Sequence, residues 1–307
     1  MDQAEWKLLK EIAELEKTPQ GAYNIRRNGA LDSRNSTANI EITTKTEPGK
    51  SGIDIRIKPG TRHESVHIPV IISQTGLSEM VYNDFFIGED CDVDIVAGCG
   101  IHNTGCETSQ HDGVHTFYVG KNSKVRYVER HYGEGDGRGE NIMNPTTVVE
   151  MDEDSYMEME TTQIKGVDST VRTTNAKLGP RATLIIREKV MTHGRQLAKS
   201  DFTVDLDGED CHTNVISRSV AKDQSRQVFL ARINGNARCY GHSECDAIIM
   251  DQGVVAAIPE VTANCVDASL VHEAAIGKIA GEQLIKLMTL GLTEKEAEEQ
   301  IVNGFLK

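Results

Sequence analysis

The sequence contains no CxxC pair, no GxxxxGK[ST] loop and no histidine four residues after His272. Without CxxC pairs, a closed four-cysteine zinc site or a ferredoxin-type cluster is not expected. Without the phosphate-binding loop, the chain should not hydrolyse nucleotides itself. The segment HEAAI lacks the second histidine of a zinc-protease helix, because Ile276 occupies that position. These absences exclude three common kinds of metal and nucleotide site.

Blocks of basic charge and long apolar runs are also absent. Lys and Arg number 33 against 47 Asp and Glu, and the formal net charge of −14 disfavours nucleic acid and anionic lipid as partners. No stretch approaches the roughly 20 apolar residues of a membrane span. The acidic N-terminus has no apolar block followed by a cleavage site, so we expect no secretory signal. We therefore expect neither a nucleic-acid nor a membrane partner.

Seven cysteines are present, none of them in a recognisable disulfide pattern. An odd number of cysteines without a signal peptide is typical of a reducing compartment, where thiols stay free for packing or for metal and sulfur chemistry. This favours a cytoplasmic location.

Apolar periodicity divides the chain into three parts. Residues 3–17 have helical spacing and a polar loop follows, whereas from Asn39 apolar and polar residues alternate as in strands. Helical spacing returns in 277–290 and 293–306, where Thr293 and Glu296 form a capping box. The expected organisation is an N-terminal helix and loop (1–38), a β core (39–273) and a C-terminal helical hairpin (274–307).

The β region repeats one unit, two alternating limbs around a Gly or Asp turn. The turn markers are 32, 27, 29 and 27 residues apart (152−120, 179−152, 208−179, 235−208), and they are Gly120, Asp152, Gly179, Gly208 and Gly235. Near-regular spacing is typical of a solenoid, in which each coil buries its apolar edge against its neighbours. The pattern predicts a mainly β protein, a right-handed parallel β-helix. A β-sandwich or jelly roll is the alternative, because such turns also suit hairpins.

Two groups of residues could bind metal. The segment CGIHNTGCETSQHDGVH supplies soft and borderline ligands, namely Cys99, His102, Cys106, His111 and His115. Its alternative interpretation is a polar loop whose ligand-type residues are merely neighbours in sequence. The second group is C-terminal and contains Cys239, Cys245, Cys265, His272 and Glu273.

Cys245 differs from the other cysteines in its flanks. Cysteines on alternating strands are usually small buried hydrophobes, which is our expectation for Cys211, Cys239 and Cys265. Cys245, however, lies between Glu244 and Asp246, whose carboxylates should raise the pKa of the thiol unless a cation or metal offsets them. Thiolate, imidazole and carboxylate together could bind iron or an iron–sulfur fragment weakly enough to release it.

The run GHSECDAIIMDQGVVAAIPEVTANCVDASLVHEAAIGKI, with the tail GLTEKEAEEQIVNGFLK, resembles the core of the SufB/SufD family of iron–sulfur cluster assembly proteins. Earlier segments such as VGKNSKVRYVE extend the resemblance to about residue 65. It implies a right-handed parallel β-helix with helical ends, which pairs through the β-helix and binds the SufC ATPase through its C-terminal helices. An ATPase partner would also explain the missing phosphate loop.

The resemblance implies roles for single residues. Cys245 matches the SufB cysteine proposed to accept sulfur or to ligate the nascent cluster, His272 the histidine shared by SufB and SufD, and Glu273 a SufB glutamate. SufB typically has Glu-His-Glu here, whereas this chain has Val271 in the first position and lacks the N-terminal extension of SufB. The sequence thus resembles a compact member that is neither a clear SufB nor a clear SufD. A relay or ligand role for Cys99 and Cys106 is a weaker expectation.

By the same resemblance we expect a non-enzymatic scaffold that carries a transient iron–sulfur cluster. Its expected partners are a second copy in a homodimer, a SufC-like ABC ATPase, a sulfur donor and apo-protein recipients. The docking surface for the ATPase would be the apolar stripe Ile301, Val302, Phe305 and Leu306. Alternatively, the helices pack only on each other and on the β-helix end.

Two other functions are compatible with a β-helix. Carbohydrate-active β-helix enzymes use paired carboxylates, which EMDEDSYMEME offers, although alternation would place these on a solvated face. One Trp and 5% aromatic residues leave little for stacking on sugars. The other alternative is a structural partner of an ATPase with no cluster of its own.

Overall fold

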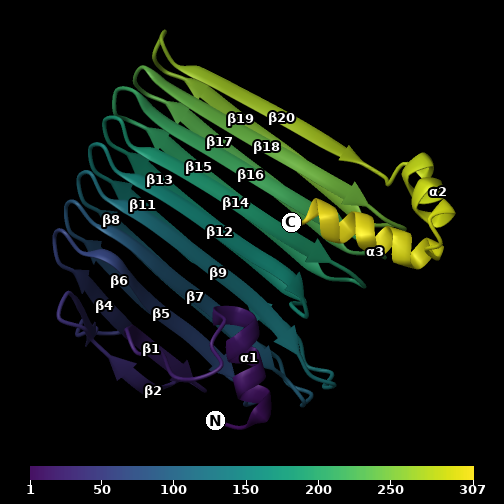
Figure 1. The fold of residues 1–307 in the computed structure, drawn as a ribbon, viewed down its shortest axis with the longest axis horizontal. Helices are drawn as coiled ribbons and strands as arrows, with labels where there is room; N and C mark the ends of the chain where they lie inside the picture. The colour runs from purple at the N-terminus through teal and green to yellow at the C-terminus, as the bar shows by residue number, and fades with distance from the viewer.

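The chain folds into a parallel β-helix with one helix at its N-terminus and two at its C-terminus (Figure 1). The computed structural model describes residues 1–307. Two 10-stranded sheets, here called sheet A and sheet B, face each other along the whole length of the β-helix. Through most of the chain, successive strands alternate between the two sheets, so two strands and their turns make one coil.

In spatial order, sheet A consists of β2 (Ala30–Asn35), β1 (Ala22–Arg27), β5 (Arg62–Ile72), β7 (Asp92–His102), β9 (Lys124–Glu134), β12 (Tyr156–Lys165), β14 (Thr183–Thr192), β16 (Cys211–Ala221), β18 (Cys239–Ile249) and β20 (Ser269–Gly277). Sheet B consists of β19 (Val254–Ala263), β17 (Arg226–Gly235), β15 (Leu197–Leu206), β13 (Ser169–Leu178), β10 (Asn141–Met143), β8 (Ser109–Val119), β6 (Ser78–Ile87), β4 (Gly52–Ile57) and β3 (Ile40–Thr44), with β11 (Thr146–Met151) also pairing β13 and β8. The helices are α1 (Gln3–Ala13), α2 (Gly281–Thr289) and α3 (Glu294–Phe305).

The register of sheet A reproduces the repeat read from the sequence. Lys124 pairs with Tyr156, and the ladder continues to Thr183, His212 and Tyr240, at separations of 32, 27, 29 and 28 (156−124, 183−156, 212−183, 240−212). All these pairings are parallel, so the predicted parallel β-helix is confirmed and the sandwich alternative was wrong. Antiparallel pairs occur only at the N-terminal end, between β1 and β2 and between β3 and β4.

The core fills the space between the two sheets. Side chains alternate along each strand, so one face of every strand points inward and the other points to solvent. Like residues stack from coil to coil, and the rings of Phe85 and Phe117 lie 4.4 Å apart. The glycines that mark the turns also stack on one another. A Cβ built on Gly208 would lie 2.1 Å from the carbonyl carbon of Gly179. Glycine is therefore needed at this turn.

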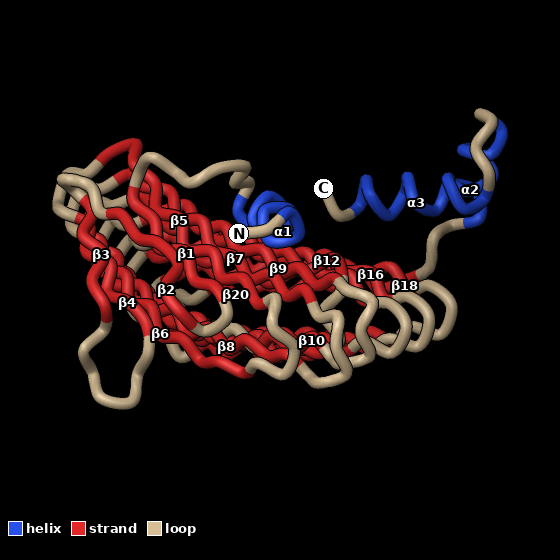
Figure 2. Tube along the Cα trace, turned by 90° about the horizontal axis from the view of Figure 1, so that it is seen from below, coloured by secondary structure: helices blue, strands red, loops and turns tan.

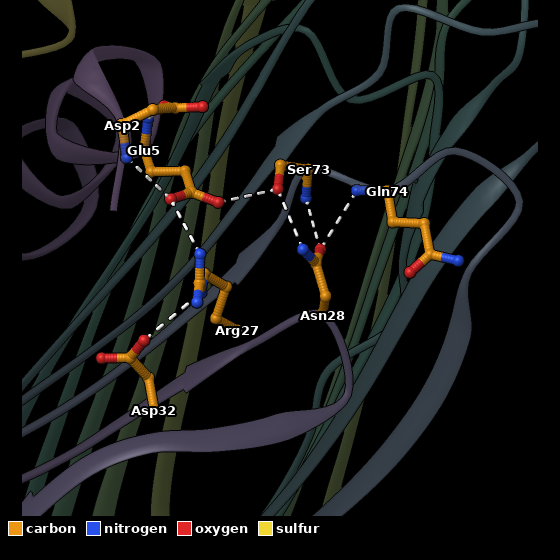
Figure 3. Close-up of polar contacts among 7 residues, drawn as sticks. All are labelled: Asp2, Glu5, Arg27, Asn28, Asp32, Ser73 and Gln74. Carbon is orange, nitrogen blue, oxygen red and sulfur yellow. Dashed lines mark hydrogen bonds and ion pairs between the residues drawn. The ribbon is translucent and has the colours of Figure 1, made fainter.

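The N-terminal segment caps and covers the first coils. Residues 18–38, which we expected to form a polar loop, contain β1 and β2. Helix α1 packs on the outer face of sheet A, where Gly98 lets the backbone of Ile12 approach: a Cβ there would lie 2.6 Å from the Ile12 carbonyl oxygen. Ser73 donates a hydrogen bond of 2.9 Å to Glu5, which also pairs with Arg27 at 3.4 Å (Figure 3). These contacts fix the helix on the sheet.

The two C-terminal helices confirm the expected helical end. Helix α3 lies over the same outer face as α1, farther along the β-helix (Figure 2). It begins at the predicted capping box of Thr293 and Glu296, and its Val302 and Leu306 pack against Val220 of β16. Helix α2 buries no residue. No helix of the protein has the length and apolar character needed to cross a membrane.

Candidate functional site

The last two strands of sheet A, β18 and β20, carry the residues that the sequence singled out. In this parallel pair, Cys245 lies beside Ala274, and Ser243 lies beside His272. Cys245 and Ser243 are buried inward-facing residues, so their partners on β20 face inward as well. Cys245 and His272 thus occupy the same inner face on neighbouring strands, offset by one inward position. The structure brings these two predicted site residues together.

The thiol of Cys245 is held neutral in the folded chain. Cys245 is 0% exposed. Burial, aided by the negative charges of Glu188 and Asp246, raises the pKa of its thiol to about 12. The sequence had predicted this direction from the flanking carboxylates. A thiolate forms at neutral pH only if a cation compensates its charge or the burial is relieved. The thiol of Cys245 is therefore unreactive as it lies in the structure.

His272 is oriented by a residue that the sequence analysis missed. The hydroxyl of Ser243 lies 2.7 Å from Nδ1 of His272, and Ser243 itself is 0% exposed. Partial burial, followed by the neighbouring His242, lowers the pKa of His272. The ring is therefore neutral at pH 7, and Ser243 engages Nδ1 and leaves Nε2 without a hydrogen-bond partner in the chain. Because every second residue of a strand faces the same side, Ser243, two positions before Cys245, could have been identified from the sequence.

Glu273 lies on the opposite face of β20 from His272. It pairs in register with Glu244, its side chain is 67% exposed, and its Oε1 lies 3.9 Å from Nε2 of His242. Strand β20 extends to Gly277 and α2 begins only at Gly281, so the β core continues past the expected boundary at residue 273. His272 and Glu273 therefore lie within a strand, and within one chain Glu273 does not share a face with Cys245.

The five ligand-type residues of the earlier segment do not all meet, and of these His111 and His115 are buried on β8. Cys99 is buried inside β7, whereas Cys106 is exposed in the following turn. Nδ1 of His102 lies 3.3 Å from Oε1 of Glu134. Across residues 1–307, no group of three or more His, Cys, Asp and Glu side chains is arranged to hold a metal ion. Among the cysteines expected to be small buried hydrophobes, Cys211 and Cys239 are buried and Cys265 is half-buried.

A buried ionic network crosses the interior and was not anticipated. Arg172 pairs with Glu129 and, at 3.7 Å, with Glu188, and all three side chains are at most 5% exposed. Burial alone would raise the pKa of Glu129, but Arg172 and then His131 hold it well below its usual range. Ser217 donates a hydrogen bond of 2.8 Å to Glu188. The network ends beside the candidate site, because Ser217 is the register partner of Cys245.

The C-terminal end of the β-helix is open. β19 and β20 are the last strands of sheets B and A, and neither has a strand on its outer edge. Apolar residues at this end are exposed, with Ile258 at 45% and Val261 at 48%. Unpaired strand edges and exposed apolar residues are features that proteins normally cover. His272 lies on β20, so the candidate site lies at this open end.

A family model described as "SUF system FeS cluster assembly, SufBD core domain" matches residues 73–305. The chain belongs to the SufBD family. Relatives of this SufBD protein include an iron–sulfur cluster assembly SufBD family protein of Methanocaldococcus jannaschii, 29% identical over 270 residues, which are 87% of this chain and 84% of the relative. Others are found in Methanothermobacter thermautotrophicus, 26% identical over 90% of this chain and 67% of the relative, and in Archaeoglobus fulgidus, 29% identical over 84% and 68%.

Proposed function

We propose that this SufBD protein is a non-enzymatic scaffold on which an iron–sulfur cluster is assembled at Cys245 and His272 and then passed on. Family membership supports a role in iron–sulfur cluster assembly. The observation that carries the finer proposal is that a buried thiol and a neutral, oriented imidazole share the inner face of β18 and β20 at the open end of the β-helix. Thiolate and imidazole are both established ligands of iron–sulfur clusters.

The scaffold acts as a homodimer that joins through the open ends. Two identical edges can meet about a twofold axis, which extends both sheets and removes the exposed apolar residues of β19 and β20 from water. His272 of each copy would then lie near its symmetry mate, with Cys245 one coil below. Four ligands from two chains would hold a cluster that neither chain holds alone.

ATP is handled by a partner of the SufC-like ABC ATPase type. Helix α2 offers the docking surface, because it buries no residue and exposes Ile285 and Leu290, at 63% and 76%. Of the stripe expected from the sequence, Val302 and Leu306 pack on the β-helix with the half-buried Phe305 against them, and Ile301 is half-buried. Movement of α2 and α3 during the ATPase cycle would strain β20 and open the dimer interface.

Opening of the interface admits the cluster components. Water then reaches Cys245, so the burial that holds its pKa near 12 is relieved and the thiol can accept sulfur or bind iron. Glu273, on the outer face next to His242, would attract iron at the entrance. A sulfur donor and apo-protein recipients complete the expected partners. The seven free cysteines fit a reducing compartment such as the cytoplasm, which is the setting we propose.

No contact in the structure favours the carbohydrate-active alternative. In the EMDEDSYMEME segment, Glu158 pairs with Arg187 and Glu160 with Arg126, each at 3.0 Å. They form a solvated ladder of ion pairs rather than a free catalytic pair.

Anaerobic reconstitution tests the proposed function. The purified chain, treated with ferrous iron and sulfide and then desalted, should retain both elements and show the charge-transfer absorption of an iron–sulfur cluster. A chain that keeps no sulfide under these conditions would instead be a structural partner of an ATPase.

The dimer should depend on the apolar end of β19. The 33.8 kDa chain should sediment as a dimer, and Val261→Lys should convert it to a monomer, because the interface would bury two unpaired ammonium groups. Leu197→Lys is the matched control, since Leu197 is similarly exposed, at 49%, but lies on β15 away from the edge. Analytical ultracentrifugation distinguishes the forms, and a Val261→Lys dimer as stable as that of the control would contradict the proposed interface.

A further inference from the structure

A small chamber lies inside the N-terminal half of the β-helix, coils away from the candidate cluster site. It has a volume of about 10 Å³, the room that one water-sized particle needs. Its lining includes Cys99, His111, His115, Glu129 and His131. On β8 the inward positions 111, 113 and 115 read His, Gly, His, so two imidazoles flank a residue without a side chain.

The first imidazole is held by its Nδ1, which leaves the opposite nitrogen, Nε2, for the chamber. Nδ1 of His111 lies 3.2 Å from Oε1 of Glu79, and Glu79 also pairs with Arg26 at 3.1 Å. A carboxylate paired with a guanidinium only accepts hydrogen bonds, so His111 donates to it from Nδ1. Nε2 of His111 has no hydrogen-bond partner in the chain.

The second imidazole is held through the same nitrogen. Nδ1 of His115 lies 2.7 Å from the hydroxyl oxygen of Tyr127 and 3.9 Å from Oε1 of Glu129. Nε2 of His115 has no hydrogen-bond partner in the chain, like Nε2 of His111.

Both free nitrogens converge on the space that Gly113 leaves empty. A Cβ built on Gly113 would lie 3.4 Å from Nε2 of His111 and 3.4 Å from Nε2 of His115. A third imidazole, His131, lines the same chamber and is 5% exposed. Its Nδ1 has no hydrogen-bond partner. Three buried imidazoles thus surround one water-sized space, and Nε2 of two of them lies next to it.

We propose that this chamber binds one divalent first-row transition-metal ion through Nε2 of His111 and Nε2 of His115. Imidazole nitrogen suits zinc, copper, iron and nickel. A histidine that ligates metal through one nitrogen usually has the other engaged by a carboxylate or another oxygen, as Nδ1 is in both of these. Nδ1 of His131 lacks a partner in the chain, and it becomes a further ligand once its ring turns toward the ion. The site is separate from Cys245 and does not rest on the proposed function.

Cobalt titration of the full chain tests the site. After chelation and desalting, the protein should take up one Co²⁺ per chain at this site with visible d–d bands, and Zn²⁺ should displace it. The decisive variant is Gly113→Ala: its methyl group would sit at ordinary contact distance from both nitrogens, so the protein should fold but the ion should be excluded. Glu79→Gln, which removes the carboxylate that accepts from Nδ1 of His111, should weaken binding about 10- to 100-fold.

Controls separate this site from the proposed cluster site. Cys245→Ser and His242→Ala should bind cobalt like the wild type, and circular dichroism should show Gly113→Ala to be folded. Wild-type protein that binds no cobalt would mean that the chamber holds only water and would overturn the proposal. Binding that survives Gly113→Ala, or a His111→Ala/His115→Ala double variant, would place the ion elsewhere and would overturn it as well.

Discussion

Replacing Arg172 with methionine is expected to lower the free energy of unfolding by about 3–5 kcal/mol. Arg172 is the only cation paired with both Glu129 and Glu188, and all three side chains are at most 5% exposed. Removing it leaves two carboxylates without a counter-charge in the interior, and they must either stay ionised at high cost or become protonated. Chemical denaturation followed by far-ultraviolet circular dichroism measures the change.

A matched control separates burial from ion pairing. Arg181 also contacts two carboxylates, Glu153 and Asp154, but its side chain is 50% exposed. Arg181→Met should therefore lower the free energy of unfolding far less than Arg172→Met does. The double variant Arg172→Met/Glu129→Gln should recover part of the loss, because one uncompensated charge is gone. If Arg172→Met were as mild as Arg181→Met, the interior network would not be the stabilising element described.

Cys245→Ser is expected to abolish cluster assembly without unfolding the chain. Serine is close to cysteine in size, so the buried position tolerates it sterically, but a hydroxyl does not replace a thiolate as a sulfur acceptor or cluster ligand. Iron and acid-labile sulfide retained after anaerobic reconstitution should fall to background, and the unfolding transition should change little.

Cys211→Ser is the control for this experiment. Cys211 is also 0% exposed, and burial raises its pKa to about 12 as it does for Cys245. It lies at the start of β16, however, away from β20, and its variant should assemble clusters normally. Equal cluster yields from the two serine variants would remove Cys245 from the proposed site.

The coils could be predicted from the sequence because their period is a property of the chain. Each coil must return to the same register to continue both sheets, so the spacing of turn markers and the register separations agree. The first coil could not be recognised by that means, since β1 and β2 form an antiparallel hairpin outside the repeat. Asn28 and Gly29 join them at φ values of 48° and 80°, and an Asn-Gly pair is a known signal for such a turn.

The candidate site was only partly predictable. Cys245 and His272 could be grouped from the sequence, but their neighbour Glu273 was grouped with them because it follows His272 directly and matches a SufB glutamate. In a strand, adjacent residues point to opposite faces. The network around Arg172 was missed for a different reason: charged residues on alternating strands usually face water, and only three-dimensional pairing with Glu129 and Glu188 makes their burial tolerable.

The central claim is that the cluster is held between two copies at the open end of the β-helix, and size-exclusion chromatography with iron detection tests it most directly. After reconstitution, iron should co-elute with the dimer of the wild type and of Leu197→Lys, and monomeric Val261→Lys should carry none. Iron that co-elutes with a monomer in an amount equal to that on the wild type would contradict the account.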